Sequence, residues 1–240
     1  MLEITISAYH KLLLDQHLTT EELVVFYLER IGRFDVNLSS IISINPNIIE
    51  QARQCDKVLR KTGKLSGKLH GVPVLVKDNI ETEDMPTTAG SLSLEGFSTG
   101  KDAELVKRLR AAGAIILAKT NLHEFAIWGE TISSIKGQTY NPYDLTHTPG
   151  GSSGGTGAAL AANFGLVGIG TDTINSIRSP SSANNLVGIR PTLGLISDDG
   201  IVPYSLSQDT AGPMARSVAD TATVLEVIAN RDLPECDHPH

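Results

Sequence analysis

Two short apolar runs, separated by a helical pattern, constrain the fold of this chain more than any other feature. Residues 72–76 form a run rich in valine, and residues 114–119 form a second run rich in isoleucine and leucine. Asp102 can cap a helix between them, and Gly113 can end it. The apolar residues of that helix recur at helical spacing, at Leu105, Val106, Leu109 and Ala112. A strand, a helix and a second strand in this order predict an α/β fold.

The remaining patterns extend this arrangement into one domain over residues 1–240. Thr5 is a plausible helix cap, Thr19 and Glu22 form a capping box, and Asn45-Pro46 opens a third helix. Ser217 caps a helix that runs to about Ala229. A helix is expected at 156–165, and strands at 166–171, 187–191 and 193–197. We therefore expect N-terminal helices at 1–65, an α/β core at 66–216, and a C-terminal helix and tail at 217–240.

Composition and charge exclude several classes of function. The 240 residues carry a net charge of −7 without a cluster of Lys and Arg, which argues against direct binding of nucleic acid. The longest apolar stretch, residues 158–170, is too short to cross a bilayer as a helix, so no membrane contact is expected. The N-terminus lacks the pattern of a secretory signal, which predicts a cytoplasmic location. Cys55 and Cys236 are too few for a disulfide framework.

The segment GGSSGG at residues 150–155 could present a nucleophile. Ser152 and Ser153 both satisfy the G-x-S-x-G pattern of a nucleophile elbow, in frames that differ by one residue. In α/β-hydrolases, however, the acid and then the histidine follow the serine in the chain. Only His238 and His240 follow here, at the very end of the sequence, which argues against a Ser-His-Asp triad.

The same segment could instead bind phosphate, because glycines before a helix expose backbone N–H groups. A phosphate-binding P-loop carries a lysine after its last glycine, where this chain has Thr156. No histidine is spaced as in a metal-binding motif. Neither a nucleotide nor a metal cofactor is therefore expected.

Lys77 is the remaining candidate for base chemistry. It ends the apolar run at 72–76, where burial would disfavour its charged form and lower its pKa. An uncharged lysine can act as a general base near neutral pH. The alternative is a strand-end lysine whose ammonium group reaches water, and position alone does not decide between the two.

Several motifs together carry a resemblance to a known family. In order and spacing the chain resembles the amidase signature family, in the segments GVPVLVKDNI, KTNLHEFA, NPYDLTHTPGGSSGGTGAALAA, GTDTINSIRSPSS and DTAGPMARSV. The resemblance implies an α/β fold with a central mixed sheet flanked by helices. It also implies hydrolysis of a small-molecule amide without a cofactor.

The resemblance implies a Ser-cisSer-Lys triad. Lys77 matches the base, Ser152 the bridging serine, whose preceding peptide bond is cis in the family, and Ser176 the nucleophile. A serine hydroxyl is a poor nucleophile until a base removes its proton. Ser152 would therefore relay the proton of Ser176 to Lys77.

The backbone N–H groups of residues 173–176 would then stabilise the oxyanion. These four residues are Thr173, Ile174, Asn175 and Ser176. Further residues are expected to support the site: Ser153 as a hydrogen-bonding residue, Asp172 and Arg178 as a pair that holds the turn, and Asp78 and Asn79 as residues that orient Lys77.

Two departures from the family pattern matter. Ile174-Asn175 stands where the family usually has Gly-Gly, which adds side chains beside the substrate. Family members are commonly about twice as long, so the sheet is expected to be incomplete and to need a homodimer or a complementary C-terminal chain. The predicted function is an amidohydrolase acting through a serine acyl-enzyme. The alternatives are an amidotransferase A-type subunit in a complex and a catalytically impaired binding homologue.

Overall fold

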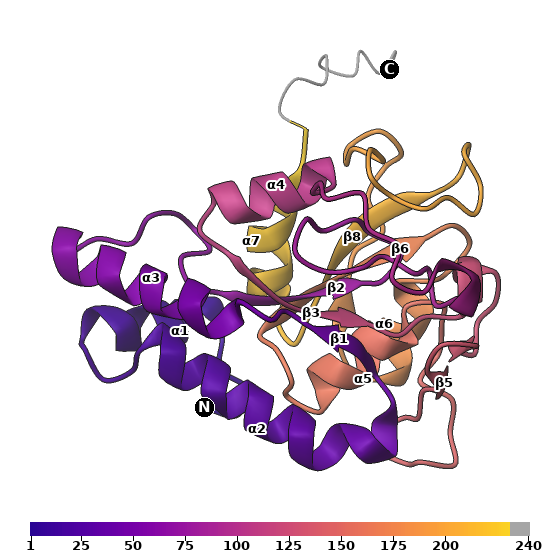
Figure 1. The fold of residues 1–240 in the computed structure, drawn as a ribbon, viewed down its shortest axis with the longest axis horizontal. Coiled ribbons are helices and arrows are strands. Elements are labelled where there is room, and N and C mark those ends of the chain that lie inside the picture. Colours follow the sequence, from indigo (N-terminus) through magenta and orange to yellow (C-terminus); the bar gives the residue numbers. More distant parts are fainter. Residues whose placement is uncertain (231–240) are drawn as a thin grey trace, which may run out of the picture.

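The computed structural model describes residues 1–230 and centres on a six-stranded mixed sheet with strand order β1-β3-β2-β6-β8-β7 (Figure 1). The strands are β1 (Ile41–Ile44), β2 (Pro73–Lys77), β3 (Ile115–Thr120), β6 (Val167–Asp172), β7 (Val187–Gly188) and β8 (Thr210–Ala215). β3, β2 and β6 run parallel to one another. β1, β8 and β7 pair antiparallel with their neighbours. The predicted α/β fold with a central mixed sheet is confirmed.

The parallel strands bring distant parts of the chain to one edge of the sheet. Val76 in β2 pairs with Lys119 in β3 and with Ile169 in β6. The carboxyl ends of the three strands therefore meet at the same edge, which is where open α/β sheets bind ligands. All residues of β2, β3, β6 and β8 are buried, so these strands lack the polar alternation of a half-exposed sheet.

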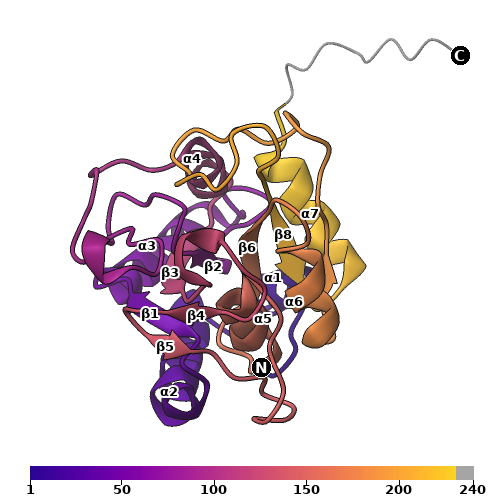
Figure 2. The same cartoon turned by 90° about the vertical axis from the view of Figure 1, so that its right-hand side faces the viewer.

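Helices cover both faces of the sheet (Figures 1 and 2). They are α1 (Ile6–Leu14), α2 (Thr20–Leu38), α3 (Ile48–Thr62), α4 (Glu104–Ala111), α5 (Gly154–Ala161), α6 (Arg178–Ala183) and α7 (Val218–Ile228). α5 packs against β2, β3, β6 and β8 from one side, with α2 beyond it. α4 and α7 pack on each other at the opposite face.

Three predicted helix caps are confirmed. The hydroxyl of Thr5 accepts a hydrogen bond from the Ala8 N–H, at 3.2 Å, and Thr19 forms the expected capping box. Ser217 caps α7. The predicted Asp102 cap is wrong, because Ala103 holds that position. The Asp102 carboxylate instead pairs with the Arg110 guanidinium at 2.9 Å and accepts from the Glu83 N–H at 2.9 Å, so both of its oxygens are engaged away from the helix.

Other sequence predictions hold only in part. The helix expected at 156–165 begins at 154 and ends at 161, and the strand expected at 187–191 is confined to 187–188. The strand expected at 193–197 is absent, because Gly194 takes a φ of +83° and turns the backbone there.

Sequence patterns missed several short elements. These are β1, β8, α6, the small hairpin of β4 (Ile132–Ser133) and β5 (Gly137–Gln138), and the turns η1 (Leu92–Leu94) and η2 (Glu124–Ala126). The predicted C-terminal tail, with Cys236, His238 and His240, lies outside the described residues. The N-terminal residues expected to be helical do contain three helices.

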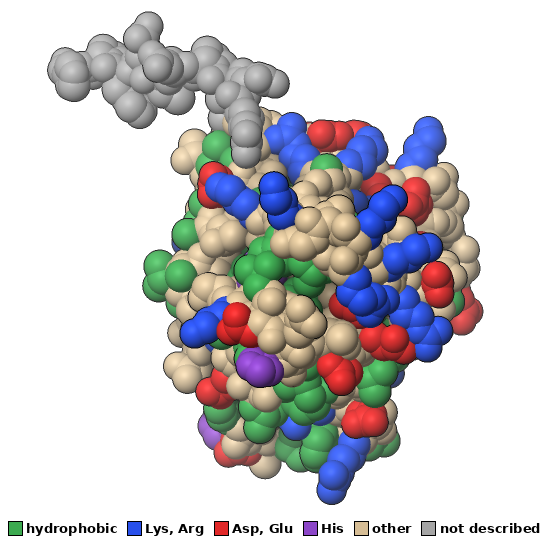
Figure 3. All heavy atoms as spheres, turned by 90° about the vertical axis from the view of Figure 1, so that its left-hand side faces the viewer, with side chains coloured by type: hydrophobic (Ala, Val, Ile, Leu, Met, Phe, Trp, Pro, Cys, Tyr) green, Lys and Arg blue, Asp and Glu red, His purple; other side chains and the backbone are tan. Residues whose placement is uncertain are grey.

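The face of the molecule near α1 and α3 carries charges of both signs. Figure 3 shows basic and acidic side chains interspersed over the face near α1 and α3. Within residues 1–230, no helix has the length and apolar character that a membrane span requires.

Candidate active site

Lys77 ends β2 in the interior of the protein, with no exposed surface. Its Nζ lies 2.7 Å from the Ser152 Oγ and 2.8 Å from the Thr171 Oγ1. Burial lowers the pKa of the Lys77 amine to about 7, although the negative charges of Asp172 and Asp209 act in the opposite direction. Of the two sequence interpretations, the buried lysine is the one observed. A large share of Lys77 is therefore uncharged near neutral pH.

Ser152 lies in a tight loop before α5, and the Gly151–Ser152 peptide bond is cis, as the resemblance implies. The Thr131 hydroxyl fixes this loop: it donates to the Gly150 carbonyl at 2.8 Å and accepts from the Gly154 N–H at 3.0 Å. A Cβ on Gly151 would lie 2.7 Å from a backbone carbon of Gly129. The glycines around Ser152 thus allow this close approach of backbone segments.

Ser153 joins the loop before α5 to the end of β6. Its backbone N–H donates to the Ser176 carbonyl at 3.2 Å. Its Oγ donates to the Thr171 carbonyl at 3.1 Å and accepts from the Thr171 N–H at 3.3 Å. Ser176, 8% exposed, therefore lies on a turn that is tied directly to the segment carrying Ser152. The predicted supporting position of Ser153 matches these contacts.

Asp172 and Arg178 hold the turn that carries Ser176. The buried Asp172 carboxylate accepts from the Ile177 N–H at 3.0 Å and from the Arg178 Nε at 3.2 Å. The Arg190 Nε lies 3.3 Å from the same carboxylate. Arg178 also donates to the Ile174 carbonyl. The predicted pairing of Asp172 with Arg178 is observed, and it closes the turn at both ends.

The turn keeps an ordinary backbone despite its departure from Gly-Gly. Neither Ile174 nor Asn175 has a positive φ. Within residues 1–230, no hydrogen bond uses the backbone N–H of Ile174, Asn175 or Ser176. These donors remain free for a ligand, while the Ile174 side chain projects outward and is 67% exposed.

A cavity of about 450 Å³ opens beside Ser176. Residues from several segments line it, namely Ala126, Ile127, Trp128, Gly129, Glu130, Thr148, Thr173, Ile174, Asn175, Ser176 and Tyr204. This volume falls within the range of small-molecule sites. The cavity therefore gives a ligand access to Ser176.

Sequence reasoning missed three residues that organise the site. Thr171 bridges Lys77 and Asn79, whose Nδ2 lies 3.1 Å from the Thr171 Oγ1. Thr131 fixes the loop of Ser152. Asp209 accepts a hydrogen bond from the Thr173 hydroxyl and another from the Tyr204 N–H, at 2.7 Å. The position of Asp209 in the DTAGPMARSV motif was the one sequence signal available for it.

Asp78 does not orient Lys77 directly, contrary to the prediction. Its carboxylate pairs with the buried Lys119, at 3.0 Å, and accepts from the Thr88 N–H at 3.0 Å. Asp78 lies in the turn that follows β2, and its carboxylate contacts Lys119 and Thr88 in place of the neighbour that it was expected to hold. Asn79 reaches Lys77 only through Thr171.

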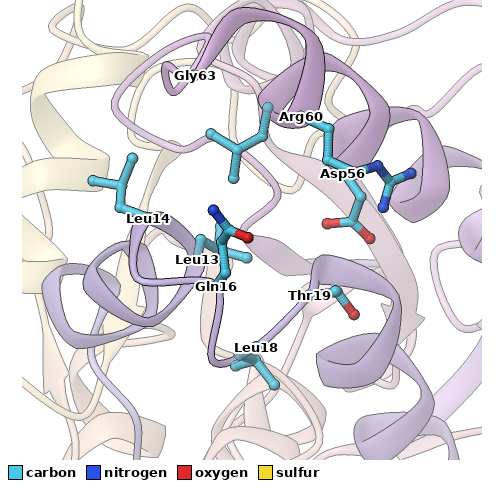
Figure 4. A pocket seen from close by; sticks show the side chains of 9 residues that line it. Leu13, Leu14, Gln16, Leu18, Thr19, Asp56, Arg60 and Gly63 are labelled. Atoms are coloured by element: carbon cyan, nitrogen blue, oxygen red, sulfur yellow. The ribbon is translucent and has the colours of Figure 1, made fainter.

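A second cavity, also of about 450 Å³, lies between α1, α2 and α3 (Figure 4). Leu13, Leu14, Leu18 and Leu59 form much of its wall. Its Asp56 carboxylate accepts from the Thr20 N–H at 2.7 Å and from the Glu21 N–H at 3.1 Å. This acid is thus occupied in capping α2, and the cavity near Ser176 is the better candidate for chemistry. Among the described residues, no group of His, Cys, Asp and Glu could hold a metal ion.

Comparison with known proteins shows the family to which the chain belongs. The model of the Amidase family matches residues 22–240. This chain belongs to the amidase family. It is 44% identical over 218 residues to the A subunit of the glutamyl-tRNA(Gln) amidotransferase of Corynebacterium jeikeium, a match that covers 90% of this chain and 44% of that protein.

Solved amidase structures share the fold. The peptide amidase from Stenotrophomonas maltophilia superposes with a TM-score of 0.91 and 46% identity, over 96% of this chain and 49% of that one. The A subunit of the glutamyl-tRNA(Gln) amidotransferase from Thermotoga maritima has a TM-score of 0.80 and 35% identity, over 96% and 47% of the two chains. The chain spans about half the length of the relatives that it matches.

Proposed function

We propose that this chain carries the catalytic residues of an amidase that cleaves a carboxamide C–N bond through an acyl-enzyme on Ser176. The observation that supports the proposal most directly is the buried Lys77, whose amine has a pKa of about 7 and lies 2.7 Å from the Ser152 Oγ. An uncharged amine in contact with a hydroxyl can accept its proton.

In the proposed mechanism the proton moves along two hydroxyls. The Ser152 hydroxyl gives its proton to the Lys77 Nζ and takes the proton of Ser176. The Ser176 Oγ then bonds to the amide carbonyl carbon. The proton returns along the same path to the departing amine, and water later attacks the acyl-enzyme by the reverse sequence. Thr171 accepts a hydrogen bond from the amine of Lys77 and so keeps its lone pair directed at Ser152.

The turn before Ser176 supplies the oxyanion site in this proposal. The backbone N–H groups of Ile174, Asn175 and Ser176 are unused by the described residues, and that of Thr173 is part of the same turn. Loss of one such donor typically costs about 3–4 kcal/mol of transition-state stabilisation. Because the donors are backbone groups, the Ile174-Asn175 departure is compatible with catalysis.

A second function has support from the comparisons. Several relatives at 41–45% identity are named as the A subunit of glutamyl-tRNA(Gln) amidotransferase. The same acyl-transfer chemistry would then release ammonia to a partner protein. The net charge of −7 favours a partner protein over direct contact with RNA in that role. Copurification of a second polypeptide would favour this alternative over a free amidase.

The test is covalent labelling of the purified chain with a small fluorophosphonate, followed by intact mass and peptide mapping. We expect one adduct, on Ser176, and ammonia release from simple carboxamides. Ser176→Ala should abolish both signals, whereas the surface control Ser207→Ala should retain them. An adduct that persists in Ser176→Ala would contradict the assignment.

A further inference from the structure

The side chain at position 174 gives the cavity beside Ser176 an apolar wall at a place where glycine would leave open space. Ile174 lies two residues before Ser176, is 67% exposed and lines the cavity. Arg178 binds the Ile174 carbonyl, and the Asn175 carbonyl accepts from the Ser179 N–H at 2.7 Å. A β-branched side chain on so restrained a backbone has few rotamers to choose from. Ile174 is therefore a fixed part of the wall.

A second segment that lines the cavity is also apolar, and it is tied to the loop of Ser152. Ile127 and Trp128 are 54% and 65% exposed, and both line the cavity. They follow the turn η2, whose Ala126 N–H donates to the His123 carbonyl at 2.7 Å. The His123 N–H in turn donates to the Ser152 carbonyl at 3.0 Å. The apolar side chains are thus held at a set position relative to the proposed relay serine.

Tyr204 extends the apolar wall from a third segment. It is 44% exposed, and its N–H donates to the Asp209 carboxylate at 2.7 Å. The same carboxylate accepts from the Thr173 hydroxyl, so the segment of Tyr204 is tied to the turn of Ile174. Three segments far apart in the sequence therefore contribute apolar surface around one opening.

The charged residues around the cavity also disfavour an anionic substrate. Glu130 is the one charged side chain among the described residues that line it. Arg178, the nearest cation on the turn, already binds Asp172 and the Ile174 carbonyl. A substrate carboxylate would thus meet a negative charge and no unpaired cation in this cavity.

We propose that Ile174, together with Ile127 and Trp128, determines specificity for carboxamides whose acyl group is apolar and carries no negative charge. The inference rests on the proposed function, because it concerns the acyl group that Ser176 would take up. Each methylene group buried against the wall favours binding, whereas an anionic group is repelled by Glu130.

The experiment compares three fluorophosphonates that react with the same serine. One carries a methyl group, the second a hexyl chain, and the third a chain of equal length that ends in a carboxylate. The second-order rate of labelling is followed by intact mass. A pocket that accepts extra methylene groups discriminates by about tenfold or more, so we expect the hexyl probe to react at least about tenfold faster than the carboxylate probe.

Two variants and a matched control test whether Ile174 and Trp128 cause the preference for the hexyl probe. Ile174→Ala and Trp128→Ala should each reduce the ratio of hexyl to carboxylate labelling several-fold. Val36→Ala removes an equally branched side chain that is 79% exposed on α2, and it should leave the ratio unchanged. Equal rates with the hexyl and carboxylate probes would overturn the inference about specificity, and so would a ratio that the two variants do not change. Either result would leave the proposed function standing. Absence of labelling by all three probes would overturn the proposed function as well.

Discussion

At Lys77 the fold buries an amine that water would keep protonated. The decrease of its pKa from 10.5 to about 7 corresponds to about 5 kcal/mol by which the site as a whole disfavours the ammonium form relative to the amine, with burial as the main cause. The site offers hydroxyl and carbonyl oxygens within reach of the amine, and the carboxylates of Asp172 and Asp209 act only from further away. This balance leaves the amine able to gain or lose a proton near neutral pH.

The ionisation of Lys77 predicts the pH dependence of Ser176 labelling. Below pH 7 Lys77 is largely an ammonium ion and cannot accept the proton relayed from Ser176. Labelling by a methyl fluorophosphonate should therefore rise with pH and level off above a midpoint near 7. The measurement is the second-order labelling rate between pH 5 and pH 9, and a rate that stays flat over this range would contradict Lys77 as the base.

The substitution Asp209→Asn tests whether the midpoint of the labelling rate follows the pKa of Lys77. The negative charge of Asp209 raises the pKa of Lys77, so its removal should move the midpoint to lower pH. The amide oxygen can still accept from the Tyr204 N–H, and the amide NH2 can donate to the Thr173 hydroxyl, which limits the structural change. A midpoint that moves to higher pH would show that Asp209 acts on Lys77 in another way.

Some residues of the site can be predicted from the sequence, and others cannot. Lys77 could be predicted because it ends an apolar run, where a charged side chain is unusual. Thr171 could not, because threonine is common in strands and its hydroxyl gains a role only once β6 lies beside β2. The resemblance placed Ser152 and Ser176, whereas the contact of Ser152 with Lys77 required the fold.

At the scale of elements, long periodic segments were predicted and short or irregular ones were not. The alternation of apolar runs and helical patterns gave β2, β3, β6, α4 and α7. β8 was missed because it contains glycine and proline, and Pro213 argues against a strand between two others. β1 has only four residues between two helices, so it carries little pattern to recognise.

Close packing of α5 on β3 is the element-level feature that positions Ser152. The Gly155 N–H donates to the Asn121 carbonyl at 3.1 Å, and a Cβ on Gly155 would lie 2.1 Å from that oxygen. Gly155→Ala should therefore push α5 away from the sheet. Overpacking of this kind costs about 1–3 kcal/mol, so we expect a lower free energy of unfolding in urea and slower labelling of Ser176.

Gly32→Ala is the matched control for that substitution. Gly32 lies within α2, is exposed, and has no atom within 4 Å of the position that a Cβ would occupy. Alanine there should raise the free energy of unfolding by about 0.5–1 kcal/mol, because it restricts the unfolded chain and favours the helix. If both alanine variants changed stability equally, the close contact at Gly155 would not be the cause.

At the scale of the whole molecule, the chain has the central sheet and the candidate site, but only about half the length of its relatives. β7, at the edge of the sheet, has two residues, so regular strand pairing on that side covers only one end of β8, and Ile189 adds one hydrogen bond to the Pro213 carbonyl at 3.1 Å. The segment from β7 to β8 runs as long loops (Figure 1) and exposes Leu193 and Leu206, at 48% and 87%. An open edge beside exposed leucines favours association with another polypeptide. Comparison of the chain's length with that of the family led us to expect a partner polypeptide. The surface that would bind it could be located only in the fold.

We predict that the purified chain, without a complementary C-terminal chain, associates with a second copy through this segment. Burial of leucine side chains supplies the driving force, at about 25 cal/mol for each Å² of apolar surface removed from water. Sedimentation at micromolar concentration should therefore give a mass above that of one chain. Leu206→Glu should shift the distribution toward the monomer, because a carboxylate cannot be buried there without a partner. Val36→Glu, on the exposed side of α2, should leave the distribution unchanged. A monodisperse monomer for the unaltered chain would contradict the prediction, and the open edge at β7 would then be tolerated because so short a strand offers little backbone to pair with.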